Sequence, residues 1–142
     1  MEQLNKALNL LSLARKGRRI EVGEEPVGAT ARAGKARLIV IASDASGHTV
    51  RRVQSFVSGS EQPYLQIPYN KDALGQAVGR TSCAIAALTD AQLALAFVKA
   101  LDEPEHYAQL LETLQTQADR VVKRRKEEKA HQKNIRQGKK KA

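Results

Sequence analysis

The sequence has few aromatic residues, one cysteine and no long hydrophobic run. Aromatic residues make up 4% of the 142 positions, so a protein that stacks successive bases on rings would have few rings to use. The one cysteine, Cys83, has no partner for an internal disulfide, which is typical of a protein in the reducing cytoplasm. The N-terminal segment lacks the pattern of a signal peptide, and no apolar stretch is long enough to span a bilayer. We therefore expect a cytoplasmic protein without a membrane partner.

Residue patterns typical of metal sites and enzymes are also missing. The histidines His48, His106 and His131 are scattered, and a single cysteine offers no metal-ligand spacing. No P-loop or dinucleotide-binding fingerprint occurs, because the glycines of GQAVG fall inside an expected helix. Asp44 and Asp90 could end adjacent strands, but two carboxylates without a base partner do not define a catalytic site. We expect no metal, no cofactor and no enzymatic activity.

Positive charge is concentrated at the C-terminus. The chain has 24 Lys and Arg against 15 Asp and Glu, a net charge of +9. Eleven of the basic and two of the acidic residues lie from Arg120 onward, which leaves 13 of each sign in residues 1–119. Such a tail attracts a polyanion, and we favour RNA binding over a merely solubilising role. The tail residues predicted to contact RNA are Arg120, Lys123, Arg124, Arg125 and Lys126.

Helical and strand patterns alternate along residues 1–101. Apolar residues at positions 4, 7, 8, 11 and 14 share one face of a helix expected at residues 3–15, and Gly17 supplies its end. Further helices are expected at residues 24–34, 46–59, 70–79 and 90–101, with Ser46, Asn70 and Thr89 or Asp90 as caps. Strands are expected at residues 20–22, 38–42, 64–67 and 83–88. This alternation predicts an α/β fold, a three-layer α/β/α sandwich around a four-stranded mixed sheet.

The segment after Pro104 follows a different pattern. Its apolar residues recur at four- and three-residue spacings, at Tyr107, Leu111, Leu114, Ala118 and Val121. We expect a long helix that first packs on its own domain and then projects, with a frayed end after Gly138. A coiled coil is less favoured, because fewer than three heptads are apolar. The chain thus divides into a domain at residues 1–101 and a helical, basic extension at residues 102–142.

Two motifs together resemble a known RNA-binding family. The first, GEEPVGATARAGKARLIVIASDAS, begins at Gly23 and joins a glycine loop, a helix and an apolar strand. The second, NKDALGQAVG, has the spacing Lys-x-x-Leu-Gly-x-Ala-x-Gly from Lys71 to Gly79. With the N-terminal LSLARKGRRIEVGEE, they resemble the kink-turn-binding ribosomal-protein family, in particular its bacterial YlxQ-like branch. The resemblance covers residues 1 to about 101.

The resemblance implies where RNA would bind. In this family, RNA lies where the glycine loop, the start of the second helix and the loop after the second motif meet. Helix N-termini favour phosphate and glycine permits close backbone approach, while Arg80 followed by two hydroxyls suits a phosphate contact. The implied contacts are Gly23, Glu24, Glu25, Pro26 and Ala29, then Gly79, Arg80, Thr81, Ser82 and Cys83, with Lys71 at a helix start.

Simpler roles compete with several of these assignments. The glycines at 23 and 79 are also what tight turns require, and the two glutamates also complement a helix dipole. Lys71 could be only an exposed charge, and Asp44 and Ser46 are better explained as turn and cap residues.

The sequence departs from the family pattern at two contact positions. The family places Asn-Glu, or a polar substitute, at the positions of Glu25 and Pro26, and a lysine at Ala29. Those side chains bind guanines and a phosphate, whereas proline and alanine side chains carry neither donor nor acceptor. Each lost base contact costs about 1–3 kcal/mol of discrimination. Lys35, Arg37 and Arg80 are the basic residues that could compensate.

Taken together, these patterns predict a non-catalytic, monomeric RNA-binding protein that associates with the ribosome or binds structured, kink-turn-like RNA. The alternative is a protein–protein interaction module on the same fold, with weak or tail-only RNA binding. The substrate-binding half of an RNA methyltransferase shares this architecture, but the sequence shows no second, catalytic domain.

Overall fold

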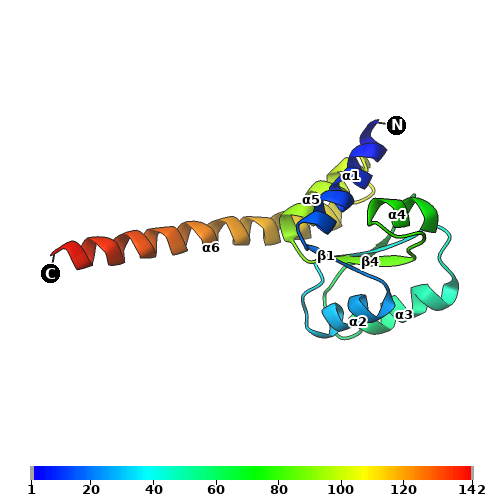
Figure 1. Ribbon diagram of the computed structural model, residues 1–142, viewed down its shortest axis with the longest axis horizontal. Helices are drawn as coiled ribbons and strands as arrows, with labels where there is room; N and C mark the ends of the chain where they lie inside the picture. The colour runs from blue at the N-terminus through cyan, green and yellow to red at the C-terminus, as the bar shows by residue number, and fades with distance from the viewer. Residues whose placement is uncertain (1, 142) are drawn as a thin grey trace.

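The computed structural model describes the backbone of residues 2–141 and the side chains of residues 5–135. Within these residues the chain forms an α/β fold with six helices and a four-stranded sheet (Figure 1). The helices are α1 (Glu2–Lys16), α2 (Glu24–Arg32), α3 (Gly47–Val57), α4 (Lys71–Ala77), α5 (Ala91–Ala100) and α6 (Ala108–Lys141). The strands are β1 (Ile20–Val22), β2 (Leu38–Ile41), β3 (Tyr64–Gln66) and β4 (Ile85–Leu88). The predicted fold class is confirmed.

The sheet is mixed, as expected, with the strand order β1-β4-β2-β3. β2 and β3 are parallel, whereas β4 runs antiparallel to both of its neighbours. Leu88 lies opposite both Ile20 and Leu38, and Ile85 lies opposite Ile41. Every residue of the central strands β2 and β4 is buried, which explains their continuous apolar sequences.

Alternate side chains of the central strands enter two separate cores. Leu38 and Val40 pack in the larger core with residues of α1, α4, α5 and the start of α6. Ile39 and Ile41 pack in the smaller core with residues of α2 and α3, including Val53. In Figure 1, α2 and α3 lie below the sheet and α1, α4 and α5 lie above it. The period-two alternation of strand side chains therefore produces the predicted three layers.

The predicted helix caps are confirmed at three helices. Ser46, Asn70 and Asp90 accept hydrogen bonds from the third residue after each of them, at 3.2, 2.8 and 2.9 Å. The end of α1 differs from the expectation, because Arg18 and not Gly17 adopts the left-handed conformation, with φ of 57°. The strands β2, β3 and β4 are each shorter than expected. Cys83, where the last strand was expected to begin, lies before β4. Leu4 lies outside the described side chains.

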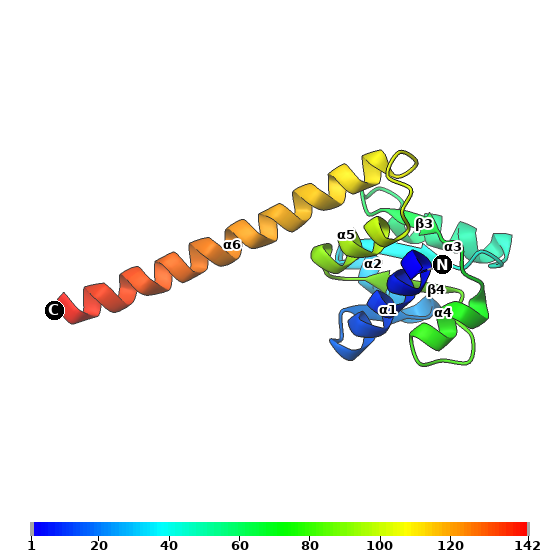
Figure 2. The ribbon, with the colours of Figure 1, turned by 90° about the horizontal axis from the view of Figure 1, so that it is seen from above.

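Helix α6 has a buried beginning and a projecting remainder. Leu114 and Ala118 are buried in the larger core together with Tyr107, just before the helix, while Val122 is already 38% exposed. α6 packs against α5 and then extends away from the sheet, as the turned view in Figure 2 also shows. The helix continues past Gly138 to Lys141, so the expected fraying is not seen. None of the helices within residues 2–141 has the length and apolar character needed to cross a membrane.

Candidate nucleic-acid interface

The glycine loop and the start of α2 form the first part of the candidate site. Gly23 has φ of 98° and ψ of 164°, a conformation open to glycine, and its N–H donates to the carbonyl oxygen of Ile85 at 3.1 Å. No side chain caps α2, in contrast to α3, α4 and α5. Glu24 is half-buried and forms an ion pair with Arg52 of α3 at 3.3 Å, whereas Glu25 is exposed.

The loop after α4 forms the second part. Gly79 takes up a left-handed conformation with φ of 77°, and the Arg80 N–H turns back to the carbonyl oxygen of Gly75 at 2.7 Å. Residues 79–82 are all exposed. A Cβ at Gly75 would lie 2.8 Å from both the Cα and the N of Ser82. The loop therefore lies directly on the backbone of α4, which only glycine at position 75 permits.

Hydrogen bonds join the two parts at one end of the sheet. The carbonyl oxygen of Ile85, the first residue of β4, accepts from the Gly23 N–H and from the Cys83 Sγ, both at 3.1 Å. The Cys83 N–H donates to the carbonyl oxygen of Lys71 at 3.0 Å, and the Lys71 N–H donates to Asp44 Oδ1 at 2.8 Å. We call this area the α2/α4 surface, made of Gly23, Glu24, Glu25, Lys71, Gly79, Arg80, Thr81 and Ser82.

Three of the residues implied as RNA contacts offer no exposed polar side-chain group. The Cys83 side chain is buried, and burial raises the pKa of its thiol, outweighing the lowering by the hydrogen bond to Ile85 and by the charge of Arg80. It therefore holds the loop from within and offers no exposed group. Pro26 and Ala29 are exposed on α2 but present no polar atoms. Asp44 orients the start of α4, in keeping with its expected turn role.

The charges of the α2/α4 surface cancel. Within its eight named residues, two glutamates balance Lys71 and Arg80, and the Arg52 that pairs with Glu24 adds one positive charge beside them. Most of the long-range attraction of a polyanion must therefore come from elsewhere on the molecule. Among the described residues, no group of His, Cys, Asp or Glu side chains could hold a metal ion.

The structure does not bring Lys35 and Arg37 to the α2/α4 surface. The Arg37 N–H donates to the carbonyl oxygen of Leu88 at 2.7 Å, so both residues lie at the other end of β4. At about 3.3 Å per residue, roughly 10 Å of strand separates Leu88 from Ile85. The tail residues Arg120 and Lys123 to Lys126 are exposed on α6.

A family model describes residues 5–96, about two thirds of the chain, as ribosomal protein L7Ae/L30e/S12e/Gadd45. The chain belongs to this family. The predicted resemblance is thereby confirmed, and the extension from Glu103 onward lies beyond the matched residues.

Individual relatives agree with this family assignment. The RNA-binding protein YlxQ of Bacillus subtilis (strain 168) is 29% identical over 93 residues, which are 66% of this chain and 92% of YlxQ. A solved structure of a protein with unknown function from Bacillus halodurans C has a TM-score of 0.63 and 28% identity, covering 69% of this chain and 98% of that one. The Giardia lamblia 15.5kD RNA binding protein has a TM-score of 0.57 and 23% identity, covering 75% of this chain and 90% of its own, and supports the fold alone.

The basic run ARKGRR, from Ala14 to Arg19, was not among the predicted contacts. It covers the last turn of α1 and the turn after it, and Arg125 of α6 lies across a cleft from it. The signal in the sequence was its density of charge at a helix end. The sequence did not indicate that α6 would pass beside it.

Proposed function

We propose that the chain is a non-catalytic, cytoplasmic RNA-binding protein that binds structured, kink-turn-like RNA. The α2/α4 surface contacts the RNA, and the tail residues from Arg120 to Lys126 supply electrostatic attraction. Ribosomal RNA is the natural candidate for such a partner, because the family is one of ribosomal proteins. The protein binds as a monomer in this proposal.

The observation that carries the proposal is the shared acceptor of the two segments: the Ile85 carbonyl oxygen accepts from the Gly23 N–H and from Cys83, which follows the exposed loop at residues 79–82. Because no side chain caps α2, the backbone N–H groups of Glu24 and Glu25 are available to a phosphate oxygen, whereas Pro26 has no N–H. The exposed loop after α4 adds Arg80 and the hydroxyls of Thr81 and Ser82, groups that commonly contact a sugar–phosphate backbone.

Selectivity for a kink-turn is expected to be modest. Pro26 and Ala29 are exposed where family members carry polar contacts, and the surface has no net charge. Backbone donors and Arg80 recognise shape and phosphate position more than base identity.

The test is RNA binding by the full chain and by Arg80→Ala, using a kink-turn RNA and a plain duplex over a range of salt concentrations. Removing one phosphate contact should weaken binding of the kink-turn RNA and lower the slope of log affinity against log salt by about 1. Lys99→Ala is the matched control, because Lys99 is an exposed lysine of α5 outside the α2/α4 surface. Equal affinity for both RNAs would reject kink-turn selectivity.

The cancelled charges of the α2/α4 surface favour one alternative, a protein–protein interaction module whose tail alone binds RNA. Truncation after Asp119 separates the two functions, since it keeps the buried Leu114 and Ala118. If that truncation abolishes RNA binding and Arg80→Ala leaves it unchanged, the alternative holds.

A further inference from the structure

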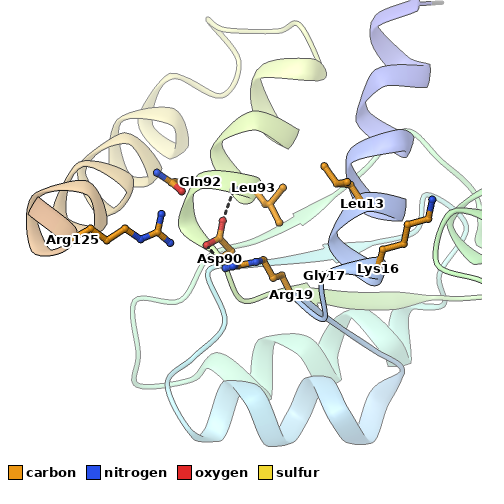
Figure 3. Close-up of a pocket in the computed structure, with 8 residues that line it drawn as sticks. All are labelled: Leu13, Lys16, Gly17, Arg19, Asp90, Gln92, Leu93 and Arg125. Atoms are coloured by element: carbon orange, nitrogen blue, oxygen red, sulfur yellow. Dashed lines mark hydrogen bonds and ion pairs between the residues drawn. The ribbon is translucent and has the colours of Figure 1, made fainter. Parts of the chain in front are cut away.

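A cleft of about 580 Å³ lies between the end of α1, the start of α5 and one side of α6 (Figure 3). It is at the end of the sheet opposite the α2/α4 surface. The carbonyl oxygen of Arg19 accepts from the Thr89 N–H here, at the end of β4 that is distant from Gly23. A cavity of this volume is in the range of sites that hold small ligands or single groups of a larger one.

Basic side chains from two distant parts of the sequence line this cleft. Lys16 ends α1, Arg19 precedes β1, and Arg125 reaches in from α6. Figure 3 shows Arg125 extending from α6 toward Asp90 and Gln92. Neither Lys16 nor Arg125 forms an ion pair with any described residue. Their charges are therefore available to a ligand.

The one acidic residue of the cleft is already neutralised. Asp90 has a side chain only 12% exposed, and it binds Arg19 Nη1 at 3.0 Å and the Leu93 N–H at 2.9 Å. It fixes the Arg19 guanidinium in place. Because half of the Arg19 side chain stays exposed, the guanidinium keeps donors for a further anion.

More positive charge surrounds the cleft at this end of the sheet. Arg15 and Arg18 are exposed beside its α1 side, and the Arg37 backbone pairs with Leu88 at the same end of β4. The α2/α4 surface, by contrast, has no net charge. The polyanion-attracting end of the domain is therefore the end with the cleft.

A row of basic residues continues from the cleft along α6. Arg125, Lys129 and Lys133 are exposed and lie four residues apart, so they share one side of the helix at steps of about 6 Å. The nearby acidic residues Glu127 and Glu128 are not members of this row. They follow Lys123 and Arg124 by four residues, a spacing that makes each glutamate a neighbour of one of those two basic residues on the helix surface. The row thus repeats one charge at a regular interval, as a nucleic-acid backbone does.

We infer that this cleft and the row on α6 form a second RNA-backbone site, so that one RNA is held at both ends of the sheet. The inference rests on the proposed RNA binding and adds a site outside the α2/α4 surface. RNA fits better than an acidic protein segment, because the charges repeat evenly and the guanidinium groups match phosphate oxygens. Leu13, 57% exposed in the cleft wall, offers an apolar contact to a ribose or an unstacked base.

The test compares two RNAs with the full chain: a minimal kink-turn RNA and the same RNA with one stem extended. The variant is Lys16→Ala/Arg125→Ala, and Lys16→Arg/Arg125→Lys is the charge-conserving control. The wild type should bind the extended RNA more tightly. The alanine pair should lose that gain and reduce the salt slope on the extended RNA by about 2, one for each phosphate contact. The control pair should retain both.

Each outcome has a distinct reading. If the wild type binds neither RNA, the proposed function itself fails. If it binds both equally, or if the alanine pair equals the wild type on the extended RNA, the second site is rejected while RNA binding stands. If only binding of poly-glutamate depends on Lys16 and Arg125, the cleft is a protein-docking site and the inference is overturned. Both side chains are exposed, and the unfolding midpoint checks that the variants fold.

Discussion

At Gly75, the absence of a side chain positions the loop that carries Arg80. A Cβ at this residue would lie 2.8 Å from two backbone atoms of Ser82 and 2.9 Å from the Arg80 carbonyl oxygen. Backbone atoms cannot rotate away as a flexible side chain does. The glycine of the motif Leu-Gly-x-Ala-x-Gly is thus explained by close packing of helix and loop.

Gly75→Ala is predicted to displace this loop. Overpacking should lower the free energy of unfolding by about 1–3 kcal/mol, and RNA affinity should fall because Arg80 moves. Gly59→Ala is the matched control. The φ of 78° at Gly59 disfavours alanine by about 1–2 kcal/mol, but a Cβ added there would have no atom within 4 Å. Denaturant unfolding and RNA titration measure both effects. Wild-type RNA affinity in Gly75→Ala would contradict this role.

At the scale of elements, α6 belongs to two environments. Its first turns fill the larger core beside α5, and its later turns carry exposed basic residues. The same helix therefore both stabilises the domain and extends its charged surface. The split follows from the sequence, where the apolar spacing gives way to the basic run after Val121.

Alanine substitutions in α6 should reveal this division. Leu114→Ala should lower the free energy of unfolding by about 2–5 kcal/mol, because the fully buried side chain would leave a cavity. Val122→Ala, two turns later and partly exposed, should change it by less than about 0.5–1 kcal/mol. Urea unfolding followed by circular dichroism distinguishes them. Similar losses at both positions would mean that α6 is not divided in this way.

For the whole molecule, the ionisable groups of the larger core favour their neutral forms. Burial raises the pKa of the Cys83 thiol above its ordinary value of 9.0 and that of Tyr69 above 10.0. Burial, followed by the charge and hydrogen bond of Glu103, also raises the pKa of Tyr107. In the unfolded chain these groups ionise at their ordinary values.

Stability should therefore decline at alkaline pH. A group with a raised folded-state pKa gives full stability below its unfolded pKa and loses it as the pH rises further. We expect the free energy of unfolding to fall from about pH 9, first through Cys83 and then through the tyrosines. Cys83→Ala should move the start of the decline toward pH 10, whatever its effect at neutral pH. An unchanged pH profile in that variant would exclude the thiol as the cause.

The sequence determined most of the local structure, because its signals are local. Caps such as Ser46 and Asn70 act within three residues, and the apolar runs of β2 and β4 indicate strands covered on both faces. The two glycine motifs indicated the family that the chain belongs to. The sequence did not identify Arg18 as the left-handed residue after α1. The rule that a glycine commonly ends a helix points to the neighbouring Gly17 instead.

Only the tertiary structure decided which of these residues lie together. The strand order β1-β4-β2-β3 puts β4 beside both β1 and β2, so Gly23 meets the loop after α4 while Lys35 and Arg37 lie at the other end of the sheet. The path of α6 brings Arg125 to the same cleft as the Arg19–Asp90 pair, with Lys16 on the opposite wall. These neighbours are distant in the sequence, and their meeting depends on non-local strand pairing and helix packing that no local pattern encodes.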